Sequence, residues 1–168
     1  MRAVPTRDTV LPSERRRGRG SRRRPTHASV KRSVAALRSV PLFDGFSNRH
    51  LRHLAEGSDL IDVAAGHAIV EEGQAGEAMF VILGGSARVV RNGRRVAGLV
   101  PGDFFGELSA LDGGPRTASV VADTDMELLR LFRHTLYRVV KEEPRLAIGL
   151  LEGIARRLRQ VQPASPVR

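Results

Sequence analysis

The sequence predicts a mainly β fold with flanking helices: an antiparallel β-roll, or double-stranded jelly-roll-like barrel, with an N-terminal helical module and two C-terminal helices. Between residues 58 and 132, short apolar runs recur roughly every eight to twelve residues and are separated by glycine-rich turns, which is typical of antiparallel strands. After residue 132 the apolar positions change to helical spacing. These two patterns place the barrel in the middle of the chain.

The helical module precedes the barrel. Apolar residues begin at Val34, and Ser47 is placed to cap a short helix in which Leu51 and Leu54 face inward. Strands are then expected at residues 59–63, 68–71, 78–83, 87–91, 94–100, 117–122 and 127–132. Between two of these strands, Asn92-Gly93 is typical of a type I′ hairpin, because both residues tolerate positive φ.

Two helices follow the barrel. Leu136 and Val139 predict a short one, and Pro144 restarts the chain at a tolerated first-turn position. The last helix is expected from about residue 145 to 161. Its predicted apolar stripe consists of Ala147, Leu151, Ile154, Leu158 and Val161. We expect this stripe to pack on the barrel, and a second copy of the chain is the alternative partner, which would give a homodimer through the last helix.

The positive charge is concentrated at the N-terminus. The 168 residues carry a net charge of +10, but residues 1–38 hold 12 basic and 2 acidic residues, whereas residues 39–168 hold 16 of each. Residues 1–33 are rich in Arg, Pro, Gly and Ser, and we expect them to form a disordered tail. Nucleic acid or an anionic surface would bind this tail rather than the neutral globular part.

Several functional classes are disfavoured by what the sequence lacks. It has no cysteine, so disulfides and cysteine-ligated zinc are excluded. It has neither a secretory signal pattern nor an apolar run long enough to span a bilayer, so we expect a cytoplasmic protein. His50 and His53 lie one helical turn apart without an obvious third ligand, so we expect solvent-facing histidines and no metal. Glu142-Glu143 are expected to be solvated helix-end charges. No catalytic constellation suggests an enzyme, and no cofactor is expected.

One connection in the barrel differs from a simple hairpin. Gly106 allows close approach of the backbone to a ligand and begins a short helical turn whose N–H groups favour an anion. Glu107 is a suitable acceptor for a neutral hydroxyl such as a ribose 2′-OH. Arg116 offers a positive fork for phosphate oxygens, and Thr117 and Ala118 offer backbone donors with little bulk. Together these residues predict a site for a nucleotide whose phosphate lies near its own ribose.

The segment FGELSALDGGPRTASV, residues 105–120, resembles the phosphate-binding cassette of the cyclic-nucleotide-binding domain family, which includes catabolite-activator-like and protein-kinase-A-regulatory-subunit-like proteins. Gly66, Gly73, Phe80 and Gly84 also match positions of that family's barrel. The resemblance covers about residues 40–162. It implies a binding domain at 34–162, between the tail at 1–33 and a short tail at 163–168.

The resemblance implies a role for each matching residue. Glu107 would accept from the ribose 2′-OH, and Arg116 would pair with an exocyclic phosphate oxygen. The backbone of Gly106, Leu108, Ser109 and Thr117, beside Ala118, would complete the cradle. Ser109 stands where the family usually has Ala, and Thr117 is similar to members that accept cGMP. We therefore expect a non-catalytic regulatory module for cAMP, with cGMP left open, that signals through movement of its C-terminal helices.

Other interpretations remain open from the sequence. One alternative is that Glu107 and Arg116 form an internal salt bridge, and another is that the cassette is degenerate and binds no ligand. In that case the chain would be a nucleic-acid-associated protein that uses its basic tail. Since no effector domain follows the last helix before Arg168, we expect an effector protein in trans.

Overall fold

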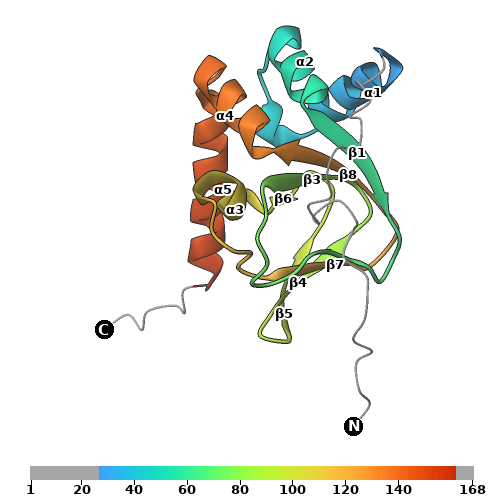
Figure 1. The fold of residues 1–168 in the computed structure, drawn as a ribbon, viewed down its shortest axis with the longest axis vertical. Coiled ribbons are helices and arrows are strands. Elements are labelled where there is room, and N and C mark those ends of the chain that lie inside the picture. Colours follow the sequence, from blue (N-terminus) through green and yellow to red (C-terminus); the bar gives the residue numbers. More distant parts are fainter. Residues whose placement is uncertain (1–26, 162–168) are drawn as a thin grey trace.

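The computed structural model describes residues 27–161 and confirms the predicted β-roll with flanking helices (Figure 1). It opens with helix α1 (His27–Arg38), a 3-10 turn η1 (Pro41–Phe43) and helix α2 (Asn48–Glu56). As predicted, Ser47 caps α2, since its side chain accepts from the His50 N–H. The expected disordered tail is too long, because α1 already includes residues 27–33. The rest of that tail and the segment 163–168 lie outside the described residues.

Helix α1 forms where disorder was predicted because its few apolar residues share one face. Val30, Val34 and Leu37 lie three or four positions apart and pack against the helical core, and Leu37 is fully buried. The arginine-rich composition of the preceding residues masked this short periodic pattern.

Within residues 27–161, eight strands form two antiparallel four-stranded sheets. The strands are β1 (Ser58–Val63), β2 (Ala68–Val70), β3 (Ala78–Gly84), β4 (Ala87–Arg91), β5 (Arg94–Leu99), β6 (Phe104–Phe105), β7 (Ser119–Ala122) and β8 (Met126–Phe132). One sheet has the order β1-β8-β3-β6 and the other β2-β7-β4-β5. The seven expected strands are all present within two residues of their predicted ends. The short β6, which pairs Phe105 with Phe80 of β3, was not predicted.

The hairpin between β4 and β5 has the predicted turn. Asn92 and Gly93 both have positive φ, at 51° and 73°, and Arg91 pairs with Arg94 across the strands. The strand expected from residue 117 begins only at Ser119. Thr117 and Ala118 precede it and lie on the wall of the cavity described below.

The core has two parts, separated by the sheet that contains β3. Along β3, Phe80 and Ile82 point into the roll, whereas Met79 and Val81 point toward the helices. All four are buried, which explains why β3 is an unbroken apolar run rather than an alternating one. The sheet β1-β8-β3-β6 is therefore the shared wall between the roll and its helical cover.

Three helices complete the fold: α3 (Glu107–Asp112), α4 (Arg133–Glu142) and α5 (Arg145–Val161). In Figure 1, α5 runs along one side of the roll, whereas α1, α2 and α4 gather at its helical end. The predicted bounds of α5 are confirmed, but its predicted stripe does not pack on the barrel. Leu151 and Leu158 are exposed, and the buried face consists of Leu146, Leu150 and Gly153.

The junction between α4 and α5 differs from the expected solvated ends. Glu143 is buried and accepts two hydrogen bonds of 2.8 Å from Arg145, and this guanidinium lowers the pKa of Glu143 to about 2. Arg145 also donates to the Gly45 carbonyl at 3.0 Å. Through these bonds, the start of α5 is fastened to the loop before α2.

The two histidines of α2 are partly exposed, and both lie beside carboxylates at the end of α4. His53 Nδ1 lies 2.7 Å from Glu142 Oε2, and a hydrogen bond from His53 is the main reason that the pKa of Glu142 is lowered. His50 Nδ1 lies 3.5 Å from Glu143 Oε2. Within residues 27–161, no group of three or more His, Cys, Asp or Glu residues is arranged to hold a metal ion. No helix in that range is both long and apolar enough to cross a membrane.

Candidate functional site

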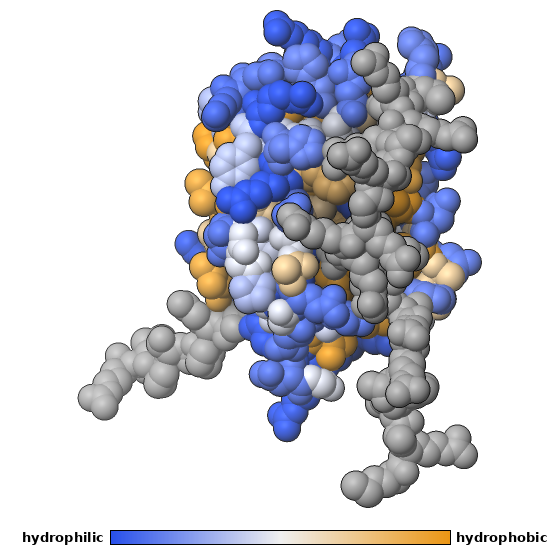
Figure 2. Space-filling view, in the orientation of Figure 1, coloured by the Kyte–Doolittle hydropathy of each residue, from blue (hydrophilic) through white to orange (hydrophobic). Residues whose placement is uncertain are grey.

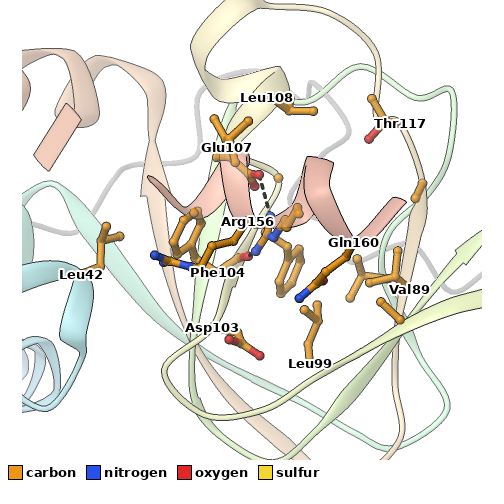
Figure 3. A pocket seen from close by; sticks show the side chains of 18 of the residues that line it. Leu42, Val89, Leu99, Asp103, Phe104, Glu107, Leu108, Thr117, Arg156 and Gln160 are labelled. Carbon is orange, nitrogen blue, oxygen red and sulfur yellow. Dashed lines mark hydrogen bonds and ion pairs between the residues drawn. The ribbon is translucent and has the colours of Figure 1, made fainter. Parts of the chain in front are cut away.

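A cavity of about 880 Å³ lies between α5 and the open side of the roll (Figure 3). Its wall includes all seven residues that the sequence singled out: Gly106, Glu107, Leu108, Ser109, Arg116, Thr117 and Ala118. Figure 3 shows Leu108 and Thr117 at one edge, Glu107 nearby, and Leu99 and Val89 on the opposite side. The cavity therefore combines a polar cassette with an apolar wall formed by β4 and β5.

The cassette begins at a left-handed turn. Gly106 has a φ of 77° and is the N-cap of α3, a conformation that glycine adopts without the steric penalty of a Cβ atom. A Cβ at this position would lie 2.7 Å from Nη1 of Arg116 and 3.1 Å from the Ala78 carbonyl oxygen. The turn directs the backbone of Gly106 against the arginine and starts α3 with Glu107.

Glu107 is buried, with 3% of its surface exposed, and its partner comes from α5. Oε1 of its carboxylate accepts a hydrogen bond of 2.6 Å from Nη1 of Arg157. The same guanidinium donates to the Phe104 carbonyl and lies over the Phe104 ring, 4.8 Å from its centroid. Glu107 therefore pairs with Arg157 and not with Arg116, so the internal Glu107–Arg116 salt bridge considered from the sequence is not formed.

Arg116 is also 3% exposed, and backbone oxygens hold its guanidinium. Nη1 donates to the carbonyls of Ala78 at 2.9 Å and Gly106 at 3.0 Å. The Cζ atom lies 5.9 Å from the centroid of the Phe80 ring. These contacts place a permanent cation directly beneath Gly106, at the base of the cassette.

The backbone around Arg116 is fixed by the segment that precedes β3. The N–H of Arg116 donates to the Gln74 carbonyl, and the carbonyl of Arg116 accepts from the Gly73 N–H, both at 2.8 Å. Gly76 lies against the guanidinium, since a Cβ there would be 2.2 Å from Cζ of Arg116. Gly76 thus makes room for the arginine.

Helix α5 supplies residues that the sequence interpretation missed. Glu152, Arg156 and Gln160 lie one helical turn apart and line the cavity. The helix comes close to the cassette at Gly153, where a Cβ would be 2.4 Å from Cζ of Phe104. A signal was present: Arg157 continues the buried spacing of Leu146, Leu150 and Gly153, and a charged residue on a buried face requires a buried partner.

The comparisons with known proteins identify the family of this domain. Residues 60–143 match the family model described as "Cyclic nucleotide-binding domain". The chain is 37% identical over 136 residues to a cAMP-dependent protein kinase regulatory subunit of Aspergillus fumigatus, which covers 79% of this chain. It is 40% identical over 129 residues to the cyclic AMP receptor protein of Thermus thermophilus, which covers 74% of this chain.

The fold is similar to that of a solved catabolite activator protein. The Thermus thermophilus catabolite activator protein superposes with a TM-score of 0.65 at 36% identity, over 71% of this chain and 59% of that chain. The chain spans 30% of the Aspergillus relative and 60% of the Thermus relative. With a family model matched across the roll and both charged cassette residues buried at one cavity, this chain belongs to the cyclic nucleotide-binding domain family.

Proposed function

We propose that this chain is a non-catalytic regulatory module that binds cAMP, with cGMP as the alternative ligand, and signals through α4 and α5. The observation that carries the proposal is the placement of Glu107 and Arg116, two buried ionisable residues of opposite charge, at one cavity beneath α5. Its volume of about 880 Å³ lies within the usual range of small-molecule sites, roughly 300–1,000 Å³.

The chemistry of the two residues matches the two polar parts of a cyclic nucleotide. The guanidinium of Arg116 suits the phosphate, because its planar fork donates to two oxygens and keeps its charge at any physiological pH. The carboxylate of Glu107 suits the ribose 2′-OH, because it is an acceptor. The apolar wall that includes Val89 and Leu99 suits the flat purine.

The contact between Glu107 and Arg157 suggests how occupancy of the cavity reaches α5. A ribose hydroxyl that donates to Glu107 competes with Arg157 for the carboxylate, or shares it in a changed geometry. Either change alters the contact that α5 makes with the cassette. A ligand shifts the position of α5 only by its difference in affinity between the two positions, and the Glu107–Arg157 pair supplies such a difference.

The exposed surface of α5 is a candidate binding site for a partner that responds to this change. Ile148 and Leu158 line the cavity and are also among the exposed apolar residues of the helix, together with Leu151. A partner seated on these side chains would contact the helix next to the ligand. We propose that an effector in trans, in the cytoplasm, or a second copy of the chain binds here.

Calorimetric titration with cAMP and cGMP tests the proposed ligand, with 5′-AMP as the control because its phosphate is not closed onto the ribose. We expect the cyclic nucleotides to bind and to be recovered unchanged. Arg116→Lys keeps the charge but loses the fork, and should weaken binding at least about tenfold. The absence of both binding heat and thermal stabilisation at about 1 mM cAMP or cGMP would contradict the proposal.

Hydrogen exchange tests the role of Arg157. In the wild type, cAMP should change the exchange rate of amides in α5. Arg157→Met removes both the ion pair with Glu107 and the bond to Phe104, so α5 should exchange faster without ligand and respond less to it. Arg159→Met, at an exposed position of the same helix that does not line the cavity, is the matched control and should behave like the wild type. A full ligand response in Arg157→Met would exclude this residue from the signal.

A further inference from the structure

A second hollow, of about 890 Å³, lies at the helical end between α1 and α2. None of its lining residues belongs to the cavity under α5. We call it the α1–α2 groove and define it by Val30, Lys31, Val34, Arg38, Arg52 and Glu56. Its composition is unusual for a surface that contacts only water, because apolar and cationic residues are combined in it.

The floor and the rim of the groove have different chemistry. Val30 and Val34 lie one turn apart on α1 and are partly buried. Lys31, Arg38 and Arg52 are exposed beside them. Lys31 and Arg38 are seven residues apart, so they lie about two turns, or roughly 10 Å, from each other along α1.

The cations of the rim are not neutralised by carboxylates in the described part of the chain. Arg38 donates to the neutral side chain of Asn48, and no ion pair of Lys31 or Arg52 is found among residues 27–161. Glu56 is the one acidic residue that lines the groove within that range. The rim therefore offers positive charge to an external ligand.

The charge of the groove is part of a wider asymmetry. Residues 27–56 contain 5 basic and 2 acidic residues, whereas the roll, residues 57–132, contains 6 basic and 11 acidic residues. Figure 2 shows hydrophilic residues gathered over the helical end. An acidic partner is thus attracted to the helices and repelled by the roll, which orients its approach.

We propose that the α1–α2 groove docks an acidic amphipathic segment of a partner protein. The apolar face of such a segment would cover Val30 and Val34, and its carboxylates would meet Lys31, Arg38 and Arg52. A nucleic acid fits less well, since a phosphate backbone leaves the valine floor uncovered. The longer helices of a second copy, α1, α2, α4 and α5, also fit less well, because each contains more basic than acidic residues. The proposal does not depend on cyclic nucleotide binding.

Fluorescence anisotropy tests the proposal with a labelled helical peptide of about 14 residues, long enough to lie along α1. Its leucines form one stripe and its other residues are mainly glutamate. We expect binding of the full chain in the range of about 10–100 μM. A peptide of the same composition, scrambled to destroy the leucine stripe, should bind at least about fivefold more weakly if the valine floor contributes.

Charge reversal locates the binding site. The double variant Lys31→Glu, Arg52→Glu should bind the peptide at least about tenfold more weakly than the wild type. Arg94→Glu with Arg159→Glu is the control; it changes the net charge equally at exposed positions outside the groove and should stay within about twofold. Circular dichroism verifies that both variants fold.

Three outcomes would overturn the proposal: no peptide binding at about 1 mM, equal weakening by the two double variants, or equal binding of the two peptides. Duplex DNA and vesicles containing phosphatidylserine serve as competing ligands in the same assay. If either of them binds more tightly than the peptide and is lost in the Lys31→Glu, Arg52→Glu variant, the groove recognises that ligand instead.

Discussion

Glu107 shows how one residue can serve both the fold and the candidate site. A buried carboxylate needs a partner, because transfer of an unpaired charge from water into the protein is costly. Arg157 provides the partner in the described structure, at 2.6 Å. Since the two residues lie on different elements, any ligand that engages Glu107 acts on the contact between the cassette and α5.

Gly76 gives a prediction about Arg116 that leaves the charge of the cassette unchanged. Gly76→Ala places a Cβ atom 2.2 Å from the present position of Cζ in Arg116, so the guanidinium must leave its place beneath Gly106. We expect at least about a tenfold loss of cAMP affinity, equivalent to about 1.4 kcal/mol. Calorimetry measures this loss directly.

A second glycine provides the control for that substitution. Gly84 lies on β3, and a Cβ there meets only Glu127 Cβ at the ordinary contact distance of 3.9 Å. Gly84→Ala should therefore keep its cAMP affinity within about twofold. If Gly76→Ala binds cAMP as tightly as Gly84→Ala does, the observed position of Arg116 is not required for binding.

Site residues that lie close together in the sequence were easier to predict than site residues that come together only through the fold. The spacing of Gly106, Glu107 and Arg116 identified one wall of the cavity, because these residues lie in one short segment. Arg157 was not identified. It lies 50 positions after Glu107, and its role depends on where α5 crosses the roll, which no local pattern specifies.

At the scale of elements, α5 shows why periodicity predicts a helix better than it predicts the helix's buried face. The bounds 145–161 were predicted, but the apolar stripe that includes Leu151 and Leu158 is displaced by roughly a quarter turn from the buried face. Gly149 and Gly153 explain the difference. Hydropathy ignores them, yet they allow α5 to approach Leu42 and Phe104 closely.

The junction between α4 and α5 predicts a dependence of stability on pH. Arg145 lowers the pKa of Glu143 from 4.5 to about 2, so the carboxylate favours the folded state. A lowered pKa means that this stabilisation is fully present above pH 4.5 and is lost as the pH falls toward 2. The melting temperature of the wild type should decrease across this window.

Glu143→Gln isolates that contribution. The variant cannot lose a proton at this position, so its melting temperature should be lower than that of the wild type at pH 6 and should approach it near pH 2. Thermal melts followed by circular dichroism measure both curves. Glu72→Gln, in a turn of the roll, is the control. Its melting temperature should differ between pH 6 and pH 2 by the same amount as that of the wild type. Parallel curves for the wild type and Glu143→Gln would rule out the assigned role of Glu143.

For the whole molecule, the two hollows occupy different parts of the fold and are joined by a chain of contacts. The cavity lies under α5, and α5 follows α4 through the Glu143–Arg145 junction. Helix α4 contacts α2 through Glu142 and His53, and α2 forms one side of the α1–α2 groove. A movement of α5 therefore has a continuous route of packed elements to the helical end.

The exposed stripe on α5 predicts that the whole molecule dimerises. Leu151 is 64% exposed, and Ile148 and Leu158 are exposed on the same helix, which forms one edge of the molecule (Figure 2). Burial of these side chains against a second copy removes apolar surface from water, so sedimentation should show a dimer at about 100 μM. Leu151→Glu places a charge in that contact without touching the cavity and should give a monomer, whereas Val100→Glu, an equivalent change at an exposed residue elsewhere, should remain dimeric. A monomeric wild type, or a dimer that survives Leu151→Glu, would show that the stripe does not hold two copies together and would leave it available to a different partner.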